Sequence, residues 1–94
     1  MIVTAAARLR TDRREEALAA ARQMQEATAT EQGCHEYRFW IAMDDPDSVL
    51  VFERWENQAS LEAHLATPHV AAFNAAITGF ADGPVTVTRF EVPE

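Results

Sequence analysis

The side chains that could carry chemistry lie close together in the middle of this 94-residue chain. They fall in three short motifs: E-Q-G-C-H-E-Y at residues 31–37, E-R-W at 53–55 and H-L-A-T-P-H at 64–69. Carboxylates and imidazoles transfer protons, and aromatic side chains can form the walls of a pocket for a flat substrate. The rest of the chain is mostly alanine, small aliphatic residues and charge. We therefore expect any site to be built from these motifs.

His64 is the first candidate for proton transfer. It shares one stripe of an expected helix with Leu61 and Leu65, which turns the imidazole inward. An inward histidine is either a packed core residue or a group that exchanges a proton near neutral pH. His69 follows in the first turn of the next helical piece, where capping, surface exposure and substrate contact all remain open.

Glu53 and Trp55 point to the same face of one expected strand, because strand side chains alternate. A carboxylate among apolar neighbours costs desolvation energy unless it is paired or used. Glu53 therefore either pairs with Arg54 or Arg89 or acts in a site. Trp55 is correspondingly either core or pocket wall.

A later helical segment places an amide among apolar residues. The spacing i, i+3, i+4 and i+7 predicts one inward face made of Val70, Phe73, Asn74 and Ile77. A buried amide needs hydrogen-bond partners, so Asn74 binds either a backbone carbonyl or a substrate oxygen. Tyr37 offers a similar polar group through its phenol.

Other kinds of site lack their usual residues. The three glycines all fall at expected turns, which argues against a flavin, nicotinamide or phosphate loop. The spacing of His64 and His69 crosses Pro68 and lacks an obvious third ligand, so we predict no metal. Cys34 begins a strand, where a small buried residue is usual. We expect no cofactor.

Composition excludes further classes of partner. A net charge of −7 disfavours binding to nucleic acid. No apolar run approaches the roughly 20 residues of a membrane span, and Met1 leads directly into a strand-like segment. A single cysteine agrees with a reducing compartment. We expect a cytoplasmic protein that binds neither nucleic acid nor membrane.

The patterning predicts the order β-α-β-β-α-β in one domain over residues 1–94. The expected segments are residues 2–9, 12–29, 37–43, 48–56, a helical region from 58 to 79 and a last strand at 85–92. Asp12 and Glu15 have the spacing of a capping box at the start of the first helix. Pro68 breaks the later helix, and Thr67 is the expected N-cap of its second part. This order is typical of an α+β ferredoxin-like two-layer sandwich with an antiparallel four-stranded sheet.

The expected hairpin is apolar on both faces. Its first strand places Tyr37, Phe39 and Ile41 on one side and Trp40 and Ala42 on the other, and its second strand is similar. Helices would cover only one face of the sheet. An apolar sheet face is rarely left exposed, so we predict a homodimer through the other face.

The three motifs also carry a family resemblance. The running pattern E-x-G-C-x-x-Y, E-x-W and H-x-x-x-P-H resembles the antibiotic biosynthesis monooxygenase family from about Met1 to Phe90. The resemblance implies a dimer that oxidises a quinol or polycyclic phenol with dioxygen, without metal or prosthetic group. It also implies roles in this sequence: His64 as base, Glu53 as its orienter, and Trp55, Phe73, Tyr37, Asn74 and His69 as substrate-binding residues.

Three alternatives remain beside this interpretation. Haem-degrading relatives have an asparagine and an axial histidine where this chain reads Ala6-Ala7-Arg8 and Asn74. A phospho-sugar isomerase shares the H-x-x-x-P-H motif but has a lysine where Glu56 stands. The third alternative is a dimer that binds an apolar small molecule without catalysis, and the sequence does not separate it from the monooxygenase.

Overall fold

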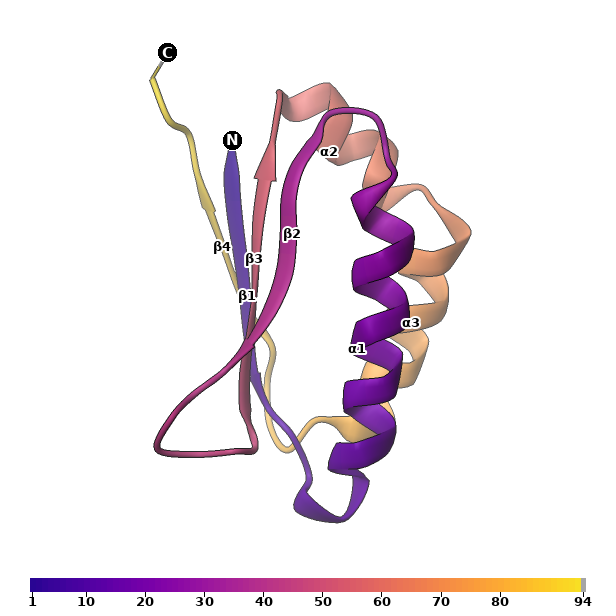
Figure 1. Ribbon diagram of the computed structural model, residues 1–94, viewed down its shortest axis with the longest axis vertical. Coiled ribbons are helices and arrows are strands. Elements are labelled where there is room, and N and C mark those ends of the chain that lie inside the picture. Colours follow the sequence, from indigo (N-terminus) through magenta and orange to yellow (C-terminus); the bar gives the residue numbers. More distant parts are fainter. Residues whose placement is uncertain (94) are drawn as a thin grey trace.

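The chain folds into two layers, a four-stranded antiparallel sheet and a layer of helices against one face (Figure 1). The computed structural model describes residues 1–93. Its elements are β1 (Ile2–Arg8), a 3-10 turn (Thr11–Arg13), α1 (Arg14–Ala29), β2 (Cys34–Ile41), β3 (Ser48–Trp55), α2 (Gln58–Leu65), α3 (Pro68–Phe80) and β4 (Thr86–Phe90). The predicted α+β sandwich is confirmed. Within residues 1–93, no helix combines the length and the apolar character needed to cross a membrane.

The register of the sheet brings one row of side chains together from all four strands. The strand order is β2-β3-β1-β4. Glu53 of β3 lies opposite Tyr37 of β2 and Val3 of β1, and Val3 lies opposite Arg89 of β4. Val3, Tyr37 and Glu53 are buried. This row therefore belongs to the face that the helices cover, which settles the orientation of Glu53.

The main core lies between this face and the helices. It consists of a cluster of buried side chains: Val3, Met24, Tyr37, Val51, Trp55, Leu61 and Val70. Trp55 and Leu61 are each only 1% exposed. Removing such apolar surface from water is the main force that holds the layers together. Because Trp55 of β3 and Leu61 of α2 belong to this core, it also fixes the positions of these two elements.

The predicted capping box at the start of α1 is wrong. Asp12 binds the guanidinium of Arg10 instead, and the helix begins at Arg14 without a side-chain cap. The buried carboxylate of Asp47, in the β2–β3 loop, accepts hydrogen bonds from Thr11 and Arg14. These contacts hold residues 11–13 in a 3-10 turn, so the α-helix starts two residues later than predicted.

The break between α2 and α3 follows the prediction. The Thr67 side chain accepts a hydrogen bond from the backbone N–H of Val70, and Pro68 occupies the first helical turn. The Thr67 hydroxyl also donates to the carbonyl of His64. The Thr67 side chain thus bonds to both the end of α2 and the start of α3, which fixes His64 relative to the beginning of α3.

Gly33 lets the α1–β2 connection approach α2 closely. Its φ of 81° lies in the left-handed region, which favours glycine. A Cβ atom at this position would lie 2.1 Å from the Ser60 hydroxyl oxygen. Any larger residue would push the connection away from α2. Gly33 thereby keeps Glu31, two residues earlier, within reach of α2 and α3.

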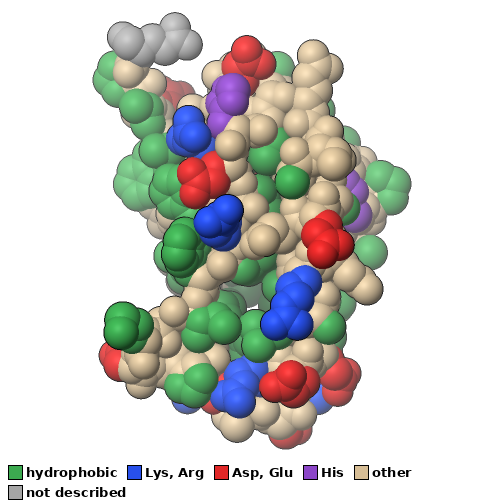
Figure 2. Space-filling model, viewed as in Figure 1, with side chains coloured by type: hydrophobic (Ala, Val, Ile, Leu, Met, Phe, Trp, Pro, Cys, Tyr) green, Lys and Arg blue, Asp and Glu red, His purple; other side chains and the backbone are tan. Residues whose placement is uncertain are grey.

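The second face of the sheet is uncovered (Figure 1). The register places Leu50 beside Trp40 and Ala6, and Phe52 beside Thr4 and Arg38, on this face. Trp40 is half exposed. Figure 2 shows hydrophobic side chains gathered along the left side of the molecule, where the sheet lies. The prediction that the hairpin is apolar on both faces is therefore only partly right. Its uncovered face carries Trp40, Leu50 and Phe52, but Glu36, Arg38 and Arg54 stand among them.

Candidate active site

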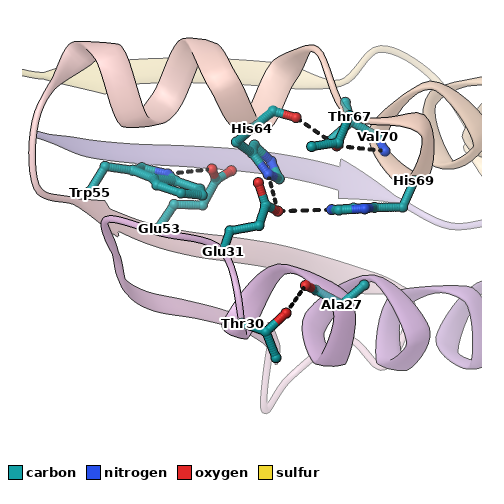
Figure 3. A network of polar contacts seen from close by, with 9 residues as sticks. All are labelled: Ala27, Thr30, Glu31, Glu53, Trp55, His64, Thr67, His69 and Val70. Atoms are coloured by element: carbon teal, nitrogen blue, oxygen red, sulfur yellow. Dashed lines mark hydrogen bonds and ion pairs between the residues drawn. The ribbon is translucent and has the colours of Figure 1, made fainter.

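His64 lies at the centre of a group of aromatic and acidic side chains (Figure 3). It projects from the last turn of α2 and is 3% exposed. Its ring centroid is 4.7 Å from that of Trp55 and 5.5 Å from that of Tyr37. The predicted inward orientation is confirmed for His64 and Leu61. It is wrong for Leu65, which is 46% exposed because α2 ends at this residue, at the edge of the covered face.

The carboxylate beside His64 is Glu31. One oxygen, Oε2, lies 2.8 Å from Nδ1 of His64 and 2.8 Å from Nε2 of His69. Figure 3 shows Glu31 reaching up from the α1–β2 connection to stand between the two rings. The prediction that Glu53 orients His64 is therefore wrong, since Glu31 makes that contact. Glu31 belongs to the first sequence motif, but it is 33 residues from His64, and local patterning gives no sign of their pairing.

The shared carboxylate determines which nitrogen of His64 is left free. An ionised carboxylate only accepts hydrogen bonds, so Nδ1 of His64 and Nε2 of His69 are the donors in this arrangement. In a neutral imidazole the second nitrogen then carries a lone pair. Nε2 of His64 is consequently an acceptor. A base that is oriented in this way by a third group recurs in sites where a proton is removed from a substrate.

Glu53 is buried and bound to Trp55. The indole N–H of Trp55 donates a hydrogen bond of 3.0 Å to Oε1 of Glu53, and Glu53 is 7% exposed. Burial raises the pKa of Glu53 above its usual range, and the hydrogen bond from Trp55 and the charges of His64 and Arg89 oppose this shift. Arg54 forms its ion pair with Glu36, at 3.8 Å. Of the partners foreseen from sequence, only Arg89 acts on Glu53, and it does so electrostatically.

The raised pKa of Glu53 predicts a specific dependence of stability on pH. Between the usual pKa of a glutamate and the raised value, the folded state binds more protons than the unfolded state, so stability falls as pH rises through this window. Glu53→Gln cannot ionise and keeps an oxygen to accept the Trp55 hydrogen bond. We expect the variant to lose this fall in urea-unfolding free energy. Glu26→Gln, an exposed change on α1, should keep it, and a Glu53→Gln profile parallel to the wild type would contradict the assignment.

A pocket of about 240 Å³ opens beside His64. It lies between the helices and the sheet, and its lining includes five of the predicted site residues: Tyr37, Glu53, His64, Phe73 and Asn74. Most of its other lining residues are apolar, together with Arg89 of β4. The structure thus brings these five residues together at one cavity, as a site made of a base, aromatic walls and polar groups requires.

Two predicted site residues do not line this pocket. Trp55 lies in the core behind His64, and His69 borders a separate groove with Met24 and Phe73. The predicted inward position of Asn74 is also wrong, because Asn74 is exposed at the pocket rim. The reason is that α3 packs mainly against α1, and β4, which lines the same pocket, is exposed along its whole length. Periodicity alone does not show where a helix leaves its sheet.

The prediction that His64 and His69 have no third potential ligand beside them is wrong. Glu31, His64 and His69 present three potential ligand atoms within 4.8 Å of one another.

Comparison with known proteins agrees with the fold and the motifs. The profile of the family described as Antibiotic biosynthesis monooxygenase matches residues 1–76. The probable quinol monooxygenase YgiN of Escherichia coli K12 is 40% identical over a stretch that covers 52% of this chain and 55% of that protein. The matched stretch thus spans about half the length of this relative.

Solved structures match over nearly the whole chain. The structure of Rv0793 from Mycobacterium tuberculosis has a TM-score of 0.90 and 28% identity, and the match covers 99% of this chain and 95% of that one. A crystal structure described as an antibiotic biosynthesis monooxygenase has a TM-score of 0.89 and 26% identity, with 99% and 100% covered. The profile match, the order of the motifs and the shared architecture agree. The chain belongs to the antibiotic biosynthesis monooxygenase family.

Proposed function

We propose that this protein is a cofactor-independent monooxygenase that oxidises a quinol or a polycyclic phenol with dioxygen. The observation that carries the proposal is the pairing of Nδ1 of His64 with Glu31 at 2.8 Å, on a histidine that lines an apolar pocket. Family membership and the name of the E. coli relative support the reaction class. The proposed task of the protein is to bury and orient the substrate and to remove one proton.

The proposed reaction begins when Nε2 of His64 accepts the phenolic proton. The resulting anion is electron-rich and passes one electron to dioxygen, and the substrate radical and superoxide then form a carbon–oxygen bond. The peroxide takes the proton back from Nε2 of His64, and the resulting hydroperoxide loses water to give an oxidised product, a hydroxyquinone in the case of a simple quinol. One oxygen atom enters the product, the other leaves as water, and the substrate supplies all the electrons.

Two further side chains at the pocket suit this chemistry. Burial, followed by the charges of Glu53 and Glu31, raises the pKa of Tyr37, so its hydroxyl stays protonated and can donate a hydrogen bond. Arg89 supplies a positive charge at the opening near β4. We propose that Tyr37 hydrogen-bonds a substrate oxygen and that the exposed Arg89 attracts the phenolate by its charge.

The size of the pocket bears on the substrate. A volume of about 240 Å³ is at or below the low end of ligand sites, which typically measure about 300–1,000 Å³. This favours a quinol of one or two rings over a larger polycycle. The test is oxygen uptake by purified, chelator-treated protein with a series of quinols of increasing ring number. Binding of these quinols without oxygen uptake would instead indicate a non-catalytic binding protein.

We propose that the uncovered face of the sheet forms the interface of a homodimer. Leu50 lies near the middle of this face, between Ala6 and Trp40 on the neighbouring strands. Leu50→Glu would place a charge without a partner in the interface. We expect the dimer to weaken by about 3–5 kcal/mol, which shifts the midpoint of dissociation by roughly 10²- to 10⁴-fold in concentration.

Sedimentation velocity of both proteins measures this effect. The matched control is Ala19→Glu, which adds the same charge at an exposed position of α1 on the far side of the helices. We expect Ala19→Glu to sediment as the wild type does. If the wild-type protein is monomeric at micromolar concentration, the proposed interface is refuted.

A further inference from the structure

Three side chains from three different parts of the chain converge on one point. Glu31 comes from the α1–β2 connection, His64 from the end of α2 and His69 from the start of α3. Figure 3 shows the Glu31 carboxylate between the two imidazole rings. Nδ1 of His64, Nε2 of His69 and a carboxylate oxygen of Glu31 all lie within 4.8 Å of one another. The Glu31–His64–His69 cluster therefore offers two nitrogen donors and one oxygen donor to a single position.

This set of donors is one that transition metals use. Two histidines and one carboxylate hold zinc in hydrolases and hold iron(II) in non-haem oxygenases, in both cases with at least one position left open. Magnesium and calcium prefer sites made of oxygen alone, so imidazole donors argue against them. The net charge of −7 also favours the approach of a cation.

The spacing is close to that of a bound ion. Ligand atoms at about 2.0–2.1 Å from a tetrahedral metal lie about 3.3 Å from one another. The carboxylate oxygen is already 2.8 Å from each nitrogen, and the two nitrogens are at most 4.8 Å apart. A modest rotation of His69 would complete the geometry. His69 is about one-third exposed, so it has room to move, and an ion can enter from its side.

The other two donors are held firmly. The backbone N–H of Glu31 donates to the carbonyl of Thr28, and the carbonyl of Glu31 accepts from Cys34. His64 is packed between Trp55 and Tyr37. Thr67 binds the carbonyl of His64 and thereby fixes the distance to the start of α3. A site whose ligands are held before the metal arrives loses less conformational entropy on binding.

We propose that Glu31, His64 and His69 bind one divalent first-row transition metal ion, with Zn²⁺ as the best match to the donor set. Binding requires the proton of each imidazole to move to its opposite ring nitrogen. Nε2 of His64 is then protonated and no longer accepts a proton from the pocket. The metal-bound form and the form with a free base are therefore two exclusive states of the same histidine, and a bound ion would inhibit the proposed oxidation.

Calorimetric titration of Zn²⁺ into chelator-treated, tag-free protein tests the site. We expect one ion per chain in the wild type. His69→Gln should weaken binding by at least about 100-fold, because even an outer-shell partner of a metal costs 10- to 100-fold when it is removed. His35→Gln is the matched control. It removes an exposed histidine of β2, outside the cluster, and should leave the affinity unchanged.

The absorption spectrum with Co²⁺ gives a second, independent measurement. Nitrogen and oxygen ligands in a four- or five-coordinate site should give visible bands in the wild type and in His35→Gln but not in His69→Gln or Glu31→Gln. Circular dichroism checks that each variant is folded. The inference is overturned if the wild type takes up no stoichiometric Zn²⁺, or if His69→Gln and Glu31→Gln both bind as the wild type does.

These measurements do not depend on turnover, so they separate this inference from the proposed function. A protein that binds Zn²⁺ through His69 but oxidises no quinol would leave the metal site in place and remove the monooxygenase proposal. If the protein oxidises quinols and does not bind Zn²⁺, the monooxygenase proposal stands and the metal site is refuted.

Discussion

His64→Gln is expected to lower the rate of quinol oxidation per folded protein by about 10²- to 10⁴-fold, the usual contribution of a positioned base. Glutamine is close to histidine in size and can still donate a hydrogen bond to Glu31, so the α2–α3 junction should persist. It cannot accept a proton at neutral pH. Alanine is a poorer probe, because His64 is 3% exposed and packs on Trp55, and its removal would also destabilise the core.

Stopped-flow or oxygen-electrode kinetics with the best quinol substrate measure the effect. His35→Gln is again the matched control, since it makes the same change at an exposed position on β2, and it should retain the wild-type rate. The proton-transfer role is refuted if His64→Gln is folded and turns over within about threefold of the wild type. The base would then be Glu53, or the acidity of the substrate itself would suffice.

Trp55→Ala is expected to destabilise the folded protein by about 3–5 kcal/mol, the range for removing a large buried aromatic side chain. Trp55 is 1% exposed and packs on His64. Its indole N–H is also the hydrogen-bond donor to the buried Glu53. Truncation therefore leaves both a cavity and a carboxylate without its partner, and the second effect adds to the first.

A second variant tests the contribution of the hydrogen bond, and a third serves as a control. Trp55→Phe keeps one aromatic ring but removes the ring that carries the N–H donor, and we expect it to cost about 1–3 kcal/mol. Met43→Ala removes a fully exposed apolar side chain in the β2–β3 loop and should stay within about 0.5 kcal/mol of the wild type. Equilibrium unfolding in urea at a fixed protein concentration measures all three variants. A loss below about 1 kcal/mol for Trp55→Ala would show that Trp55 is not central to the core.

The sequence predicted the fold well where the signal was local. The turn composition of residues 44–47 separated the two hairpin strands, and Thr67 with Pro68 marked the break between α2 and α3. The start of β2 was placed three residues late. A register shift lies between Cys34 and Glu36, so these residues pair with β3 irregularly, and their types show no strand pattern.

The sequence predicted less of the site, because its decisive contacts are long-range. The inward orientation of His64 followed from helical periodicity. Its pairing with Glu31 did not, because the close approach at Gly33 that brings the two together exists only in the folded chain. The prediction that Asn74 points inward was wrong for a different reason. Its helical position was read correctly, but the helix leaves this side open near β4, and only the packing of α3 on α1 shows it.

We propose that this chain inserts one oxygen atom into a quinol without help from a cofactor. The most direct measurement is the reaction of chelator-treated protein with its best quinol under isotopically labelled dioxygen, followed by mass spectrometry of the product. We expect one labelled oxygen atom in each product molecule, the second recovered as labelled water, and loss of both signals in His64→Gln. Oxygen uptake no faster than in buffer, or uptake that yields hydrogen peroxide and an unlabelled product, would contradict it.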